Sequence, residues 1–139
     1  MDRTLVLIKP DAMQRGLAST ILSRLERAGL RMIGIKMLHL DKALAQKHYA
    51  VHRDKPFFND LVDYISSAPI VAAVFQGDKV VEISRKIMGA TDPKKAESGT
   101  IRGDFGQDIE HNSVHGSDSA ETAEKEIKLF FSEDEIYTY

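Results

Sequence analysis

The sequence of 139 residues has no cysteine, which excludes a disulfide framework, a thiolate metal site and redox chemistry through thiols. It has no run of about 18 apolar residues that would cross a membrane, and it begins without the charged-then-apolar pattern of a secretory signal. We therefore expect a soluble, unprocessed, cytoplasmic protein with no membrane partner. Neither sign of charge is in large excess, because 19 basic and 21 acidic residues leave a formal net charge of −2. Nucleic acid is not expected as the main ligand.

The glycine-rich motifs that bind phosphate through backbone amides are also missing. Gly29 and Gly34 have the separation of a P-loop, but Ile35 follows where that motif needs a lysine, and no GxGxxG run is present. Any phosphate chemistry in this chain must therefore use side chains.

Apolar segments predict three strands, at residues 4–9, 30–40 and 70–75. The first and third are apolar almost throughout, which is typical of strands buried on both faces of a sheet. In the second, the alternation predicts that Ile33, Ile35 and Met37 share one face. The length and the 42% apolar content fit one compact domain over residues 1–139.

Helical spacing of apolar residues predicts five amphipathic helices around these strands. They are expected at 18–28, at 41–49 with Asp41 as the cap, at 58–65, at 80–87, and from a capping pair of Asp118 and Glu121 to residue 131. Residues 90–113 read as an irregular segment, and a loop of this length in a compact domain is usually functional or disordered. Helices covering a central sheet make an α/β or α+β sandwich, whose topology the pattern leaves open.

Two segments, GTIRGDF at 99–105 and NSVHGSDS at 112–119, look like signatures of the nucleoside diphosphate kinase family. The resemblance continues through LVLIKPDAMQRG near the start, HYAVHRDKPFF in the middle and AEKEI near the end, so it covers essentially the whole chain. It implies a ferredoxin-like α+β fold, with a four-stranded antiparallel sheet and helices on one side. It also implies an enzyme that moves the γ-phosphate of a nucleoside triphosphate, typically ATP, to a nucleoside diphosphate in two ping-pong steps.

His115 is the candidate nucleophile. A neutral imidazole is nucleophilic near neutral pH, and its phosphoramidate both accepts and returns a phosphoryl group. A histidine without context is more often a satisfied structural residue, but Gly116 allows close approach, and Asn112 and Ser117 are local hydrogen-bonding groups. The resemblance implies that Ser117 and Glu126 orient the ring, with Glu126 accepting the proton of the nonreacting nitrogen. Taken alone, Glu126 reads as a solvated helix carboxylate.

The cations Lys9, Arg85 and Arg102 lie on separate segments, and each taken singly reads as a surface cation, least so Lys9 at the end of a buried strand. The resemblance brings them together around a nucleotide. It implies sugar and phosphate contacts from Lys9 and Asn112, phosphate-chain contacts from Arg85, Thr91 and Arg102, and a wall near Lys9 from Tyr49. Mg²⁺ is expected to be bound through the nucleotide phosphates and water, because the sequence has no dedicated carboxylate cage.

The resemblance also implies a clamp for the base between Phe57 and Ile109, with Leu61 one helical turn beyond Phe57. Stacking does not distinguish the hydrogen-bonding edges of the bases, so broad tolerance of base and sugar is expected. The stacking energy is about 1–3 kcal/mol per base. Spacing alone equally allows Phe57 and Phe58 to belong to the core.

The remaining histidines and lysines carry weaker signals. We read His39, His48, His52 and His111 as solvent-facing or structural, and Lys94 and Lys95 as part of a solvated loop. Two rival functions stay open, a noncatalytic binding or scaffold module and a phosphohistidine carrier that serves protein partners.

The resemblance implies a homo-oligomer built from dimers. The hexamer is favoured because Pro93 is present, in a loop that packs against neighbouring subunits in the family. The tetramer is the alternative, since the sequence ends at Tyr139 without the longer C-terminal segment of many members.

Overall fold

The computed structural model describes residues 2–139 and contains a four-stranded antiparallel sheet in the order β2-β3-β1-β4. The strands are β1 (Asp2–Ile8), β2 (Arg31–Leu38), β3 (Ile70–Gly77) and β4 (Val114–Gly116). Strand β1 pairs along its whole length with its central neighbour β3, from Asp2 opposite Gly77 to Ile8 opposite Val71. The expected α+β fold class with its antiparallel sheet is confirmed.

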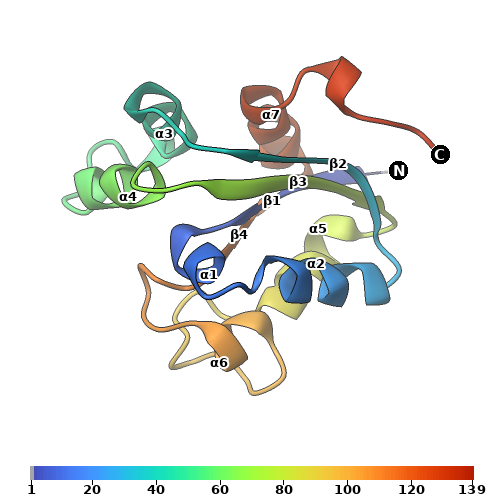
Figure 1. Cartoon of the computed structure of the whole chain (residues 1–139), viewed down its shortest axis with the longest axis horizontal. Helices are drawn as coiled ribbons and strands as arrows, with labels where there is room; N and C mark the ends of the chain where they lie inside the picture. The colour runs from blue at the N-terminus through green and yellow to red at the C-terminus, as the bar shows by residue number, and fades with distance from the viewer. Residues whose placement is uncertain (1) are drawn as a thin grey trace.

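Helices cover both faces of this sheet (Figure 1). One face carries α3 (Lys42–His48), α4 (Phe58–Ile65) and α7 (Ala120–Phe130), and the other carries α1 (Pro10–Gln14), α2 (Ala18–Arg27), α5 (Val80–Met88) and α6 (Ile101–Phe105). Short 3₁₀ turns follow α3 at Ala50–His52 and α7 at Glu133–Glu135. The implied placement of helices on one side is therefore wrong. None of the helices within residues 2–139 is long and apolar enough to span a bilayer.

The two covered faces explain why β1 and β3 are apolar throughout. Leu5 and Leu7 of β1 point into the core beneath α3, α4 and α7, whereas Val6 and Ile8 point into the core beneath α1, α2 and α5. Residues 70–75 of β3 alternate in the same way, and all six are buried. A strand that is buried on both faces has apolar side chains at every position and not only at alternate ones. The sequence-based prediction that these two strands are buried on both faces is confirmed.

Strand β2 departs from its predicted alternation. The ladder to β3 pairs Met32 with Phe75 and Gly34 with Val74, so Ile33 is the extra residue of a β-bulge. A bulge shifts every later side chain to the opposite face. Ile33 is consequently 4% exposed, whereas Ile35 is 50% and Met37 66% exposed. The prediction that these three share one face is wrong.

Three short elements lie where no element was predicted. Helix α1 follows Lys9 directly, with Pro10 in its first turn. Helix α6 lies within the segment read as irregular, and β4 follows directly after that segment. Thr100 caps α6 by accepting the Gly103 N–H at 3.1 Å. The cap of α7 is Ser119, whose hydroxyl accepts the Thr122 N–H at 3.0 Å, so the predicted capping pair of Asp118 and Glu121 is wrong.

The bulge in β2 predicts that Ile33 and Ile35 differ in their contribution to the stability of the fold. Ile33→Ala is expected to lower the free energy of unfolding by about 2–5 kcal/mol, because it opens a cavity in the core. Ile35→Ala, on the same strand, is expected to change it by less than about 0.5 kcal/mol. Urea unfolding of both variants measures the difference, and equal losses would show that Ile35 is buried as the alternation predicted.

Candidate active site

The register of β4 places His115 on the face of the sheet covered by α3 and α7. His115 lies opposite Leu7, which points into that core, while Val114 lies opposite Ile8 and points into the other one. The His115 side chain is partly exposed, at 22% of its surface. A Cβ added to Gly116 would come within 2.7 Å of the Met88 sulfur, so this glycine lets α5 pack close behind the histidine.

A carboxylate on α7 holds one nitrogen of the His115 ring. Nε2 lies 3.1 and 3.2 Å from the two oxygens of Glu126, and the Ser117 hydroxyl donates to Oε1 of Glu126 at 2.5 Å. Ser117 in turn accepts the Leu5 N–H at 3.3 Å. Burial opposes ionisation of Glu126, but the hydrogen bonds from His115 and Ser117 outweigh it and lower the pKa of the carboxyl. An ionised Glu126 accepts the Nε2 proton, which leaves the lone pair on Nδ1.

His48 packs edge-on against His115, with ring centroids 4.6 Å apart, and also contacts Tyr49 and Phe130. Its side chain is buried, and burial followed by the nearby His115 lowers the pKa of His48 to about 3. The ring is therefore neutral and structural, and it is not solvent-facing. Ligand atoms of His48, His115 and Glu126 lie within 4.8 Å of one another, but Glu126 already serves as the hydrogen-bond acceptor of His115 and Ser117.

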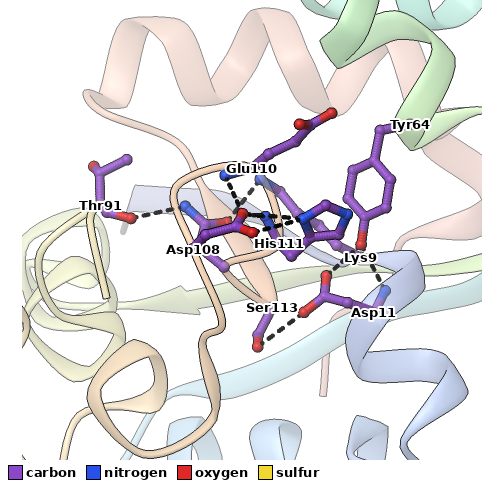
Figure 2. Close-up of polar contacts among 9 residues, drawn as sticks. Lys9, Asp11, Tyr64, Thr91, Asp108, Glu110, His111 and Ser113 are labelled. Carbon is purple, nitrogen blue, oxygen red and sulfur yellow. Dashed lines mark hydrogen bonds and ion pairs between the residues drawn. The ribbon is translucent and has the colours of Figure 1, made fainter. Parts of the chain in front are cut away.

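A second group of side chains surrounds Lys9, at the exit of β1. The Lys9 ammonium donates to the Asn112 side-chain oxygen at 2.8 Å, and the Asn112 amide donates to the Thr91 carbonyl at 3.0 Å. Figure 2 shows Lys9 and Thr91 in this network. Burial, followed by repulsion from Arg102, lowers the pKa of Lys9 to about 8. Lys9 is thus a buried cation held against a loop that the sequence placed far away.

Two guanidinium groups complete the cationic side of the site. Buried Arg102 donates to the carbonyls of Gly89 at 2.9 Å and Val114 at 2.8 Å, and exposed Arg85 donates to the Gly116 carbonyl at 3.4 Å. Burial, followed by repulsion from Arg85, lowers the pKa of Arg102 to about 10. Both guanidinium groups therefore bond to the backbone on either side of His115.

A cavity of about 950 Å³ joins these groups. Eleven of the twelve side chains singled out in the sequence line it: Lys9, Tyr49, Phe57, Leu61, Arg85, Thr91, Arg102, Ile109, Asn112, His115 and Glu126. The twelfth, Ser117, is fully buried behind Glu126. Phe57 and Ile109 are 43% and 61% exposed, so Phe57 is not a core residue, whereas Phe58 packs against the core beneath α4.

Known proteins resemble this chain over its whole length. The sequence profile of the family described as "Nucleoside diphosphate kinase" matches residues 2–136. A nucleoside diphosphate kinase of Dehalococcoides mccartyi is 63% identical over 139 residues, which are 100% of this chain and 98% of that protein. One from Pyrococcus abyssi is 55% identical over 141 residues, covering 99% of this chain and 89% of the relative.

The chain belongs to the nucleoside diphosphate kinase family. It is accordingly a nucleotide-binding phosphotransferase, and the resemblance read from its motifs is confirmed.

Solved structures of nucleoside diphosphate kinases share the fold as well. The enzyme of Aquifex aeolicus superimposes with a TM-score of 0.95 at 41% identity, covering 98% of this chain and 99% of the other. A halophilic nucleoside diphosphate kinase from Halobacterium salinarum, solved in complex with CDP, gives a TM-score of 0.97 at 48% identity, covering 100% and 93%.

Several residues of the cavity are not among the site residues predicted from the sequence. They are Lys47, His48, Ala50, Val51, His52, Asp60, Glu110, Thr122, Lys125 and Leu129, together with Asp118, which the sequence predicts as a helix cap. Most lie one to four positions from a residue that was singled out. Those on α3, α4 and α7 could have been predicted from helical spacing, because residues three or four apart share a helix face.

The contact between Glu126 and His115 predicts the tautomer of the histidine. In its neutral form His115 is expected to carry its proton on Nε2 and to leave Nδ1 free, because Glu126 is ionised and accepts that proton. Long-range ¹⁵N NMR correlation of the imidazole reads the tautomer directly. Glu126→Gln is expected to weaken the preference, and an Nδ1-protonated ring in the unsubstituted protein would contradict the assignment.

Proposed function

We propose that this chain transfers the γ-phosphate of a nucleoside triphosphate, typically ATP, to a nucleoside diphosphate through a phosphohistidine on Nδ1 of His115. The observation that carries the proposal is the contact of Glu126 with Nε2 of a histidine that lines the cavity, because this contact leaves Nδ1 as the nitrogen with the free lone pair. The donor nucleotide leaves as a diphosphate after the first half-reaction, and a second diphosphate then takes the phosphoryl group back.

In the first half-reaction the lone pair of Nδ1 attacks the γ-phosphorus, and the bond from that phosphorus to the bridging β–γ oxygen breaks, so the diphosphate leaves with the electron pair. Positive charge develops on the ring as the N–P bond forms. The Glu126 carboxylate, held by the Ser117 hydroxyl, stabilises that charge through Nε2–H and keeps the ring in place. The second half-reaction reverses these steps with the new diphosphate.

The phosphate chain is proposed to lie along the cationic side of the cavity. Arg85, Arg102 and Thr91 hold its nonbridging oxygens, while Lys9 and Asn112 contact the sugar hydroxyl and the transferring phosphate. Tyr49 forms the wall beside Lys9. Mg²⁺, which neutralises phosphate charge, would be held by the nucleotide and water, because the grouping of candidate ligands within residues 2–139 offers two imidazoles where Mg²⁺ prefers oxygen.

The base is proposed to lie at the outer end of the cavity, between Phe57 and Ile109, with Leu61 beneath. Both rim side chains are apolar and exposed in the free protein, which supports stacking and accounts for a broad choice of base. The relative from Halobacterium salinarum was solved with CDP, so a pyrimidine nucleotide binds in this family. A protein-serving phosphohistidine carrier would leave the apolar rim without a role.

The domain organisation, the oligomeric state and the cellular location of the protein are likewise proposals. We place one nucleoside diphosphate kinase domain over residues 1–139, supported by the family match over residues 2–136. We propose a homo-oligomer, with the hexamer favoured over the tetramer, on the family resemblance and Pro93. A cytoplasmic location is also proposed, because a sequence without cysteine fits a reducing compartment.

Labelled ATP tests the proposed reaction. The protein is incubated with ATP labelled on its γ-phosphate and then chased with unlabelled GDP, beside His115→Gln and the control His39→Gln, which alters an exposed histidine outside the cavity. The unsubstituted protein and the control are expected to take up an acid-labile, base-stable label that GDP removes as GTP. His115→Gln is expected to take up none. An unlabelled wild type that still binds nucleotide would refute the phosphohistidine.

The pH dependence of kcat/KM is expected to reflect the protonation of Lys9. Because its pKa is lowered to about 8, the ammonium loses its proton above that pH, and kcat/KM is expected to fall on the alkaline side near pH 8. Lys9→Arg places a guanidinium there, whose pKa is ordinarily well above that of an ammonium, so this variant is expected to move the alkaline limb to higher pH even though its overall rate is lower. Steady-state rates from pH 6 to 10 check this, and an unchanged limb in Lys9→Arg would assign it to another group.

A further inference from the structure

A second polar cluster lies next to the nucleotide cavity and is centred on the buried carboxylate of Asp11 (Figure 2). The Tyr64 hydroxyl donates to Oδ1 of Asp11 at 2.6 Å, and the Ser113 hydroxyl donates to Oδ2 at 3.2 Å. The Asp11 N–H donates back to the Tyr64 oxygen at 2.8 Å. Asp11, Tyr64 and Ser113 do not line the cavity, so substrate contact does not explain them.

Each member of the cluster stands beside a residue that does line the cavity. Asp11 is two positions after Lys9 in α1, and Tyr64 is one helical turn after Leu61 in α4. Ser113 separates Asn112 from β4, two positions before His115. The Asp11 carboxylate therefore joins three parts of the structure: α4, which carries Leu61; α1, which follows Lys9; and the turn before His115.

Ser113 occupies a backbone conformation that needs support. Its φ of 75° lies in the left-handed region, which serine rarely adopts. Two contacts hold it there: its carbonyl accepts the Lys9 N–H at 2.9 Å, and its hydroxyl reaches Asp11. This turn sets the direction of Asn112, whose side chain bonds Lys9, relative to His115.

Tyr64 extends the cluster to the loop of Ile109. Its ring packs edge-on against His111, with centroids 4.6 Å apart, and His111 Nδ1 lies 3.0 Å from a carboxylate oxygen of Asp108. Burial, followed by the hydrogen bond to Asp11, raises the pKa of Tyr64 and keeps its hydroxyl protonated. The hydroxyl is therefore a permanent donor to Asp11 over the working pH range.

Asp11 also acts on Lys9 through charge. The charged or titratable groups facing Lys9 are Asp11 on α1, Arg102 on α6, Glu110 on the adjoining loop and His48 on α3. Burial and then Arg102 lower the pKa of Lys9, whereas Asp11 and then Glu110 raise it. Among the groups that keep Lys9 cationic, Asp11 has the larger influence.

We propose that Asp11, Tyr64 and Ser113 form a positioning unit that fixes Lys9 and Asn112 relative to His115 and that Asp11 additionally supports the positive charge of Lys9. The unit acts through Lys9 and Asn112 and does not touch substrate. The inference rests on the proposed phosphohistidine reaction, since it assigns residues that prepare that site.

Two conservative variants separate the two roles of the unit. Tyr64→Phe removes only the hydroxyl and keeps the ring beside His111, while Asp11→Asn removes the charge and keeps the size of the side chain. Tyr137→Phe is the matched control, because it removes the hydroxyl of an exposed tyrosine outside the cavity. The measured quantities are the single-turnover rate of His115 phosphorylation by ATP, the KM for ATP, the pH profile and the unfolding midpoint.

Tyr64→Phe is expected to slow phosphorylation about tenfold, because a small misplacement of reacting groups costs far more than a lost surface contact. Its KM for ATP is expected to change by less than about threefold, since the rim and arginine contacts stay. Its alkaline limb stays where it is in the wild type, because no charge near Lys9 has changed. Tyr137→Phe is expected to match the wild type in every measurement.

Asp11→Asn is expected to slow phosphorylation as well and, unlike Tyr64→Phe, to move the alkaline limb of kcat/KM to lower pH by about half a unit or more. The sign follows from the lost negative charge, without which Lys9 gives up its proton at lower pH. A residue that only stabilised the fold would lower the unfolding midpoint without moving this limb.

The outcomes distinguish failure of this inference from failure of the proposed function. If wild-type protein takes up no label, the phosphohistidine reaction itself is refuted. If wild type is phosphorylated and folded Tyr64→Phe reacts at the wild-type rate, the positioning unit is refuted. If Asp11→Asn keeps the wild-type alkaline limb, the charge role of Asp11 is refuted.

Discussion

The pairing of the short strand β4 with β1 is the interaction on which the site depends. Lys9 N–H bonds the Ser113 carbonyl, His115 lies opposite Leu7, and Ser117 N–H bonds the Leu5 carbonyl. These few backbone contacts place the proposed nucleophile His115, Ser117 behind Glu126, and Lys9 along one edge of β1. Since β1 is buried by helices on both faces and paired on both edges, it is among the most constrained parts of the molecule. Groups held on such a strand keep their relative positions better than groups on loops.

The helix layers on the two faces of the sheet contribute different kinds of side chain to this edge. The layer of α3 and α7 supplies the acceptor for the His115 proton, Glu126, and the neutral ring of His48 that packs beside it. The opposite layer supplies the cations, since Arg85 comes from α5 and Arg102 from α6. Both guanidinium groups bond to carbonyls of β4, so the three-residue strand is the meeting point of the layers. The side chains proposed to bind the anion and the carboxylate proposed to orient the nucleophile thus come from separate elements and meet at β4.

The sequence predicted the elements that carry a clear period and missed those that do not. Residues 4–9 and 70–75 were recognised because both faces are apolar, and the helix stripes followed from their spacing. A three-residue strand such as β4 and a one-turn helix such as α6 contain too few residues to show a period. The bulge at Ile33 reversed the faces of β2, and no composition signal marks it. The twelve residues named for the site came from motif resemblance, because only the fold brings Lys9, Arg102 and Asn112 within reach of one another.

Burial of so many charged groups in one place has a consequence for nucleotide binding. Lys9 and Arg102 are held in an environment that lowers the pKa of both, by burial and by repulsion between cations. Folding has already removed most of the surface of these two side chains from water, so a polyphosphate that binds them would displace less hydration than it would at exposed cations. The phosphate charge would in turn raise the pKa of each cation, so nucleotide binding and protonation favour each other. The carboxylates of Asp11 and Glu126 keep this arrangement stable in the free protein, since each accepts hydrogen bonds and lies beside a group that is or becomes positive. We therefore propose that the cationic side of the cavity is arranged for an anion before the anion binds.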